Sequence, residues 1–282
     1  MRWTKKYPNP VIVKKEIDVM INTIVKSLLK AYSRKEIKGI YLKGSANKRW
    51  DTIVDYVPEI SDIDIHVLFW KNSMANDFCR TFTEALNIKK QIEIGYHRSI
   101  SNPIHLPRPQ ITVINHLQKQ ENYEPSPSET VKVLFGSQYP GGTFDEKKPS
   151  KKAYIKMILT EKDFLARYPL QIVDKPGKYN FVSLRLISWR ISAIGPKILV
   201  LHNIQRKEAW SLNHTGVYRK LSEIGHRKLA DDYALFYKKC WDYFLGHFQD
   251  GKSASVALIS GVNVLKRTIA MAEKISGNSY LR

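Results

Sequence analysis

Two aspartates on one short apolar segment are the residues of this chain best suited to do chemistry. Asp62 and Asp64 lie in Ser-Asp-Ile-Asp-Ile-His-Val-Leu-Phe, residues 61–69, where apolar and polar residues alternate. This period of two predicts a β-strand with one apolar face and both carboxylates on the other. Positions two apart on a strand lie roughly 6.5 to 7 Å apart, since the chain rises about 3.3 Å per residue. Two carboxylates at that spacing can share hard divalent cations such as Mg²⁺ or Mn²⁺.

The charge around this pair differs from that of the rest of the chain. The protein has 282 residues and a formal net charge of +20, yet residues 51–70 contain five acids and no Lys or Arg. His66 shares the polar face, and we interpret it as a polar neighbour because hard cations prefer oxygen ligands. A different interpretation is that the strand is a solvent-facing edge whose charges discourage aggregation. The residues upstream favour a metal site.

A glycine and a serine end the preceding predicted strand. Residues 38–46, Lys-Gly-Ile-Tyr-Leu-Lys-Gly-Ser-Ala, form a short apolar run that leads directly into Gly44 and Ser45. A glycine at a strand end lets backbone N–H groups approach a phosphate closely, and a following serine adds a hydroxyl donor. Gly-Ser by itself is common in turns. Its position at the end of the strand that precedes Asp-x-Asp is what indicates a phosphate site.

Together the two motifs resemble those of the nucleotidyltransferase superfamily related to DNA polymerase beta, including its minimal and aminoglycoside-type members. The resemblance covers roughly the first 120 residues. It implies that Gly44 and Ser45, with Lys43 beside them, bind the triphosphate of a nucleoside triphosphate. It also implies that Asp62 and Asp64 hold two Mg²⁺ (or Mn²⁺) ions for attack on the α-phosphate. The expected activity is metal-dependent transfer of a nucleoside monophosphate to a hydroxyl group.

Two features depart from the family pattern. Sixteen residues separate Ser45 from Asp62, so the connecting segment 46–60 is enlarged, and we expect it to act as a lip over the substrate. The family also supplies a third carboxylate from a later strand, as a general base worth about 10²- to 10⁴-fold in rate. The later strand predicted here, residues 109–115, contains no acid. Glu93 is the nearby candidate, on a segment that we expect to be helical.

The periodicity predicts an α+β fold. A nucleotidyltransferase-like domain with a mixed sheet, residues 1–140, is followed by a basic helical domain, residues 150–282. A helix is expected from Pro10, capped by Asn9, and another from about Ser73 through Leu86. Seven prolines within residues 101–150 indicate loops and a domain boundary. The predicted strands cover residues 38–46, 61–69, 109–115 and 131–135.

The second half is predicted to be helical to its end. Apolar stripes recur at helical spacing, and one of them is expected to break at Gly195-Pro196. The aromatic stripe is assigned to the core and not to a base-stacking platform; it comprises Tyr233, Phe236, Tyr237, Trp241, Phe244 and Phe248. A final stripe is expected to close the bundle through Val256, Ile259, Val262, Leu265 and Ile269.

Composition indicates a cytoplasmic protein with no membrane partner. The two cysteines, Cys79 and Cys240, are far apart in the sequence and suit reduced thiols. The first residues lack the apolar run of a signal peptide. The longest mostly apolar stretch, residues 255–265, is too short to cross a bilayer.

The excess of positive charge suits an anionic partner. Residues 1–130 carry 20 basic and 14 acidic side chains, and residues 131–282 carry 26 and 12. A cluster just before the helical domain contains Lys147, Lys148, Lys151, Lys152 and Lys156. It is either a solubilising surface or part of a site for a nucleoside triphosphate, with RNA as a further partner.

Three functions stay open at this point. The first is transfer of a nucleoside monophosphate to a hydroxyl of a small molecule or a protein. The second is addition of nucleotides to RNA ends, since archaeal enzymes that add CCA to transfer RNA carry similar motifs. The third is binding of nucleotides or nucleic acid without catalysis, which the lack of a clear third acid keeps open. No residue in the sequence identifies the acceptor or the base.

Overall fold

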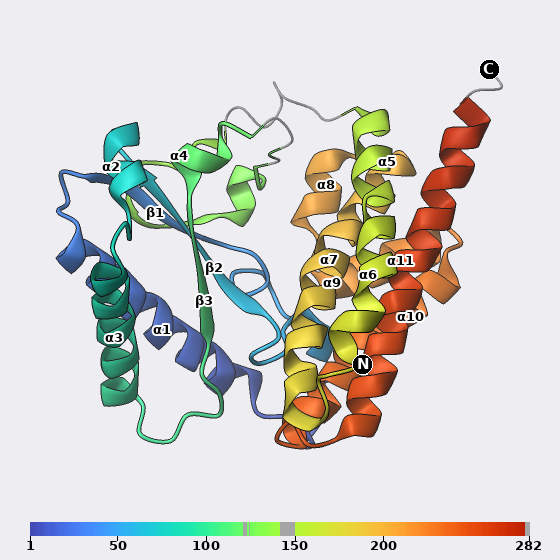
Figure 1. The fold of residues 1–282 in the computed structure, drawn as a ribbon, viewed down its shortest axis with the longest axis horizontal. Coiled ribbons are helices and arrows are strands. Elements are labelled where there is room, and N and C mark those ends of the chain that lie inside the picture. The colour runs from blue at the N-terminus through green and yellow to red at the C-terminus, as the bar shows by residue number, and fades with distance from the viewer. Residues whose placement is uncertain (121–122, 124, 142–149, 280–282) are drawn as a thin grey trace. The chain divides into compact units, whose positions relative to one another are not determined.

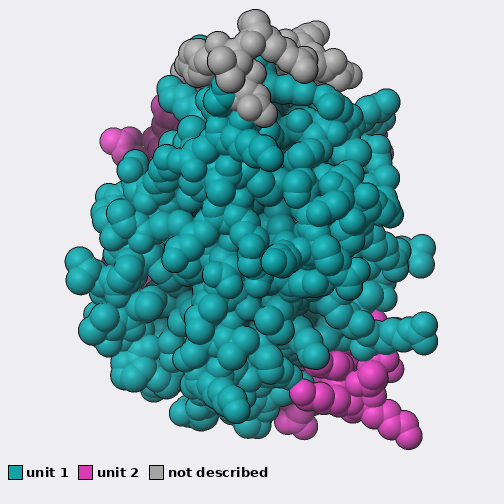
Figure 2. Space-filling model, turned by 90° about the vertical axis from the view of Figure 1, so that its right-hand side faces the viewer, with its two compact units in different colours: residues 1–2, 49–60, 148–282 teal, residues 3–48, 61–147 magenta. Residues whose placement is uncertain are grey.

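The computed structural model describes residues 1–120, 123, 125–141 and 150–279 (Figure 1). The chain forms two compact units, coloured in Figure 2. The sheet unit consists of residues 3–48 and 61–147, and the helical unit consists of residues 1–2, 49–60 and 148–282. The α+β class, with a mixed sheet and a helical C-terminal region, is confirmed.

The sheet has four strands in the order β3-β2-β1-β4. β1 (Ile37–Lys43) is antiparallel to both of its neighbours, β2 (Asp62–Phe69) and β4 (Lys132–Gly136), whereas β2 is parallel to β3 (Arg108–Val113). All four strands lie within a few residues of their predicted positions. The strand with the two aspartates is an interior strand, so the interpretation of Asp-x-Asp as a sheet edge is wrong.

The two faces of β2 differ as the alternation predicted. On one face Ile63, Ile65 and Val67 are fully buried, and the Phe69 ring lies 5.6 Å from that of Tyr32, just after α1 (Pro10–Ala31). The other face carries the two aspartates and His66. Towards the end of the strand this second face is closed by a small core cluster of Tyr41, Leu68, Ile114 and Tyr139.

The helix expected from about Ser73 is in fact two helices, α2 (Asn72–Asp77) and α3 (Phe82–Ser99). Cys79, between them, has a φ of +53°, a conformation that a continuing right-handed helix excludes. Thr81 then caps α3 with its side chain. The cap and the left-handed residue outweigh the apolar spacing that continues across them. By contrast, α1 begins as predicted, with Asn9 accepting a hydrogen bond from a first-turn N–H.

The helical unit is built from seven described α-helices (Figure 1). They are α5 (Lys151–Leu159), α6 (Glu161–Ile172), α7 (Asn180–Leu201), α8 (Arg206–Ser211), α9 (His214–Glu223), α10 (Arg227–Leu245) and α11 (Gly251–Ser279). Four residues of the predicted aromatic stripe lie in the core of α10: Tyr233, Phe236, Tyr237 and Trp241 are at most 1% exposed. The last two, Phe244 and Phe248, are only partly buried, and Phe248 follows the end of the helix.

α7 runs without interruption through Gly195 and Pro196, where a break was expected. Both residues are buried. A Cβ on Gly195 would lie 2.7 Å from Cγ1 of Val217 on α9, so the glycine permits a close approach of the two helices. This packing outweighs the cost of a proline inside a helix, typically about 3 kcal/mol.

α11 is longer than the apolar stretch seen in the sequence. Its residues Gly251–Gly277 have the length and hydropathy of a membrane-crossing helix, but half of the most apolar window is buried inside the structure. A core helix of a soluble protein meets the same criteria, so the structure is compatible with a soluble protein. Ile259, predicted to lie in the core, is 61% exposed. Leu265 and Ile269 of the predicted stripe are buried, and small residues such as Ala254, Ala257 and Gly261 complete the buried face.

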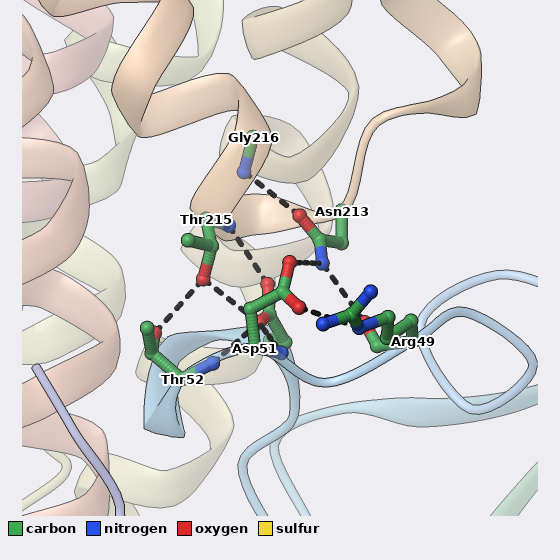
Figure 3. A network of polar contacts seen from close by, with 7 residues as sticks. Arg49, Asp51, Thr52, Asn213, Thr215 and Gly216 are labelled. Atoms are coloured by element: carbon green, nitrogen blue, oxygen red, sulfur yellow. Dashed lines mark hydrogen bonds and ion pairs between the residues drawn. The ribbon is translucent and has the colours of Figure 1, made fainter.

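Residues 49–60, which connect β1 to β2, fold with the helical unit. Asn213, the N-cap of α9, donates its side-chain N–H to the Arg49 carbonyl at 2.9 Å and to the Asp51 carboxylate at 3.0 Å (Figure 3). The Arg49 guanidinium pairs with the same carboxylate at 2.8 Å. The segment predicted to be a lip over the substrate is therefore an integral part of the helical unit. The predicted limits of the helical domain, residues 150–282, did not include this segment.

Asp55 fixes the centre of this segment. Its buried carboxylate accepts hydrogen bonds from the N–H and the hydroxyl of Thr215, both at 2.7 Å, at the start of α9. It also accepts the backbone N–H groups of Asp51 and Thr52 at 2.8 and 2.9 Å. The indole of Trp241 donates to two carbonyl groups of the same segment. One carboxylate thus satisfies four donors that have few alternatives.

We expect Asp55→Ala to lower the free energy of unfolding by about 3 kcal/mol, because it leaves buried N–H groups without an acceptor. Asp231→Ala is the matched control, since its exposed carboxylate pairs only at the surface with Arg227, a contact worth about 1 kcal/mol or less. Urea unfolding followed by circular dichroism measures both. Equal losses in the two variants would show that Asp55 does not hold the segment.

Candidate functional site

The two motifs meet where β1 ends. The antiparallel register places Lys43, the last residue of β1, directly opposite Asp64 on β2. Opposed residues share a face of the sheet, with Cβ atoms about 4.5 to 5.5 Å apart. The ammonium group and the carboxylate are therefore neighbours, and the chain turns away at the next residue, Gly44.

Gly44 has a backbone conformation and a contact that a side chain would forbid. Its φ is +76°, and a Cβ there would lie 2.0 Å from Oδ2 of Asp64. Both features require glycine at this position. Ser45 follows, partly buried. Asn47 closes the turn, donating its N–H to the Gly44 carbonyl at 3.2 Å and its side chain to the Thr130 carbonyl at 2.8 Å.

β3 places an arginine and a glutamine beside the two aspartates. The parallel register aligns Arg108 with Asp62 and Gln110 with Asp64, so all four side chains belong to one face. Nε and Nη2 of Arg108 both donate to Oδ1 of Asp62, at 2.9 and 2.6 Å. The strand on which a third carboxylate was sought therefore contributes a cation and an amide to this face.

Glu93, the candidate third carboxylate, lies on α3. It pairs with Lys89 one turn earlier, at 2.6 Å, and its side chain is 44% exposed. Such an i,i+4 pair is typical of an exposed helix face. Among the described residues, no group of three His, Cys, Asp or Glu side chains is placed to hold a metal ion. The described structure therefore does not bring Glu93 together with Asp62 and Asp64.

Burial raises the pKa of both site carboxyls. For Asp64, burial outweighs the opposing charge of Lys43, and the nearby charge of Asp62 raises the pKa further. For Asp62, burial outweighs the charge and the hydrogen bonds of Arg108. The neighbouring cations thus compensate the two negative charges incompletely. A further cation at this face would favour ionisation of both groups.

His66 continues the polar face beyond Asp64. Burial, with the positive charge of Lys43, lowers its pKa to about 3, so the ring is neutral at physiological pH. Its Nδ1 is buried without a hydrogen-bond partner among the described residues, and its ring centroid lies 6.4 Å from that of Tyr139. These contacts are consistent with a polar neighbour of the site, as predicted from the preference of hard cations for oxygen.

The donor chemistry fits a hard divalent cation bound together with a phosphate group. Mg²⁺ usually keeps several waters and takes one or two carboxylates plus phosphate oxygens from its surroundings. Asp62 and Asp64 are ligands of that kind and number. They do not form a complete protein cage, and Arg108 already contacts one of them.

The predicted lysine cluster is described only in part. Lys147 and Lys148 lie outside the described residues, whereas the other members are exposed on α5: Lys151, Lys152 and Lys156. Lys151 donates to the side-chain oxygen of Asn203 at 2.5 Å. This exposure suits a solvated surface and an anionic partner equally well.

Arg108 and Gln110 are the site residues that the sequence did not indicate. The strand was predicted to begin at Pro109, one residue after the arginine. Extending the alternation back by one residue would have put Arg108 and Gln110 on the same face. Their alignment with the two aspartates depends on the parallel register of β2 and β3, which no local pattern specifies.

The raised pKa of Asp64 makes the metal-free stability depend on pH. Because its pKa in the folded state lies above that of the unfolded chain, ionisation favours unfolding, and stability is lost as pH rises from about 4 through the folded-state pKa. Asp64→Asn removes this effect. Its free energy of unfolding relative to the parent should therefore rise from pH 4 to pH 7.

Thermal or urea unfolding in a chelating buffer, repeated at several pH values, measures this difference. Asp77→Asn serves as the control, because Asp77 is an exposed carboxylate of the same unit, paired with Arg80. If the difference in free energy of unfolding between Asp64→Asn and the parent does not change with pH, burial does not raise the pKa of the Asp64 carboxyl.

No family model matches the chain, and no curated protein matches it. The site residues and their chemistry therefore have to carry any functional proposal.

Proposed function

We propose that this protein binds a nucleoside triphosphate with Mg²⁺ or Mn²⁺ and transfers the nucleoside monophosphate to a hydroxyl acceptor. The observation that supports this most is the contact between the two motifs. Gly44 leaves room that a side chain would take from the Asp64 carboxylate, and Lys43 lies opposite Asp64. A phosphate-binding turn and a pair of metal-binding carboxylates would thus serve the same ligand.

In this proposal each residue has a separate role. The turn at Gly44 and Ser45 binds phosphate oxygens through backbone N–H groups and a hydroxyl, and Lys43 adds positive charge. Asp62 and Asp64 hold the metal ions. When bound, such ions polarise phosphoryl oxygens and neutralise charge on the reacting phosphate. No described carboxylate beyond these two is placed to take the acceptor's proton, so that base would come from the acceptor itself.

A second candidate function is binding of nucleotides without transfer. It is favoured by the register of β3, which aligns Arg108 and Gln110 with the two aspartates where the family pattern would have an acid. A guanidinium and an amide can bind phosphate, but neither accepts a proton at neutral pH. In that case the chain would respond to a nucleotide and not consume it.

The acceptor of the proposed transfer is a small molecule or a protein rather than RNA. Single-stranded RNA is usually bound by aromatic platforms on which successive bases stack. Five of the six aromatic residues of α10 are buried, although Trp189 on α7 is 65% exposed. RNA remains the alternative acceptor, given the charge of +20. The proposed place of action is the cytoplasm, where triphosphates are abundant and the two free cysteines stay reduced.

Labelled triphosphates test the proposal directly. The parent protein is incubated with each α-labelled nucleoside triphosphate, Mg²⁺ or Mn²⁺, and either total RNA or a cell extract freed of RNA. Label in RNA supports the alternative acceptor, and label in another product supports the main proposal. Metal-dependent binding without any transfer supports the second candidate. Asp62→Asn and Asp64→Asn should each abolish metal-dependent binding, and wild-type binding by both would contradict the proposed site.

The phosphate-binding turn gives an independent prediction. Ser45→Ala should weaken triphosphate binding about ten- to hundred-fold, since a hydrogen bond to a charged group is worth about 1.5 to 3 kcal/mol. Gly44→Val should remove binding altogether, because the side chain would collide with Asp64. Isothermal titration calorimetry measures both, with Ser73→Ala on α2 as a control for loss of a hydroxyl. Unchanged affinity in Ser45→Ala and Gly44→Val would exclude this turn as the phosphate site.

A further inference from the structure

Arg108 contacts one of the two proposed metal ligands directly. Two of its N–H groups converge on a single oxygen, Oδ1 of Asp62, at 2.9 and 2.6 Å. The arginine side chain is 43% exposed, whereas that of Asp62 is 14% exposed. The guanidinium therefore reaches from the accessible side onto a carboxylate that is mostly covered.

A metal ion and Arg108 compete for this carboxylate. A divalent cation bound to Asp62 would lie close to the guanidinium, and like charges repel strongly where water is partly excluded. Arg108 also occupies Oδ1, one of the two oxygens through which Asp62 could bind a cation. Free metal must therefore displace the arginine or bind beside it, and both lower its affinity.

A triphosphate changes this balance. Arginine binds phosphate oxygens through its planar fork of N–H donors at least as readily as it binds a carboxylate. Arg108 is aligned with Asp62 and lies next to Gln110, which is aligned with Asp64, so a phosphate bound at these carboxylates lies beside the arginine. With a phosphate as its new partner, the guanidinium can leave Asp62 without becoming unpaired.

We propose that Arg108 is a counter-ion that the ligand displaces: it holds Asp62 when the site is empty and moves to a phosphate group when metal and triphosphate bind. This inference rests on the proposed function of the site, and it adds a condition under which the metal ion binds there. Metal alone binds weakly, and metal and triphosphate bind cooperatively. The arginine would thus keep free divalent cations from filling the site before the nucleotide arrives.

Arg108→Gln separates the two roles because they predict changes of opposite sign. With Mn²⁺ as the only ligand, the variant should bind about ten-fold more tightly than the parent, since the competing cation is gone. With inorganic tripolyphosphate in the presence of Mn²⁺, it should bind about ten-fold more weakly, since a hydrogen-bonded phosphate contact is lost. Electron paramagnetic resonance of free Mn²⁺ measures the first affinity, and calorimetry measures the second.

Two further variants make the result specific. Arg98→Gln removes the same charge from an exposed position of α3 in the same unit, and it should leave both affinities close to those of the parent. Arg108→Lys keeps the positive charge and should keep most of the competition with Mn²⁺. This variant also provides the comparison if Arg108→Gln does not fold, because in that case Arg108→Lys should still bind tripolyphosphate more weakly than the parent.

Failure of this inference is distinguishable from failure of the proposed function. If Asp64→Asn leaves Mn²⁺ binding unchanged, the site itself is misplaced. If Asp64→Asn abolishes Mn²⁺ binding but Arg108→Gln binds Mn²⁺ no more tightly than the parent does, the site stands and the displaced counter-ion is overturned. A change of the same sign for Mn²⁺ and for tripolyphosphate would also overturn it.

Discussion

The rest of the site depends on two carboxylates that share one face of an interior strand. An interior position removes Asp62 and Asp64 from bulk water, so their charge has to be compensated by neighbours. The sheet does this through its registers: β1 sets Lys43 opposite Asp64, and β3 sets Arg108 beside Asp62. Burial still raises the pKa of both carboxyls. Because Lys43 and Arg108 already lie beside the two carboxylates, the proposed site is suited to binding a metal ion together with an anion.

The same site is tied to the helical unit through the chain itself. The connection between the two motifs, residues 49–60, has its polar groups engaged by α9 and α10 and not by the sheet. The proposed phosphate-binding turn precedes this segment and the two aspartates follow it, so both motifs are joined in the chain to a segment that folds with the helices.

Much of this could be predicted from local patterns, and the reasons for the misses are physical. Alternation located the four strands, and helical spacing located the buried aromatic residues of α10, since burial on one face of an element has a fixed period. These patterns misjudged Cys79 and Gly195, where a left-handed residue and a close helix contact override local preference. Helical spacing placed Ile259 in the core, because the spacing of large apolar residues does not show on which face of α11 the small residues pack. Arg108 was missed because only the parallel register makes it a neighbour of Asp62.

Anomalous diffraction from crystals grown with Mn²⁺ and a non-hydrolysable nucleoside triphosphate would test the central claim most directly. We expect a Mn²⁺ peak within coordination distance of carboxylate oxygens of both Asp62 and Asp64, with the triphosphate at Gly44 and Ser45. We also expect that the Arg108 guanidinium has left Oδ1 of Asp62 for a phosphate oxygen. Mn²⁺ bound elsewhere, or a bound triphosphate with Arg108 still on Asp62, would contradict it.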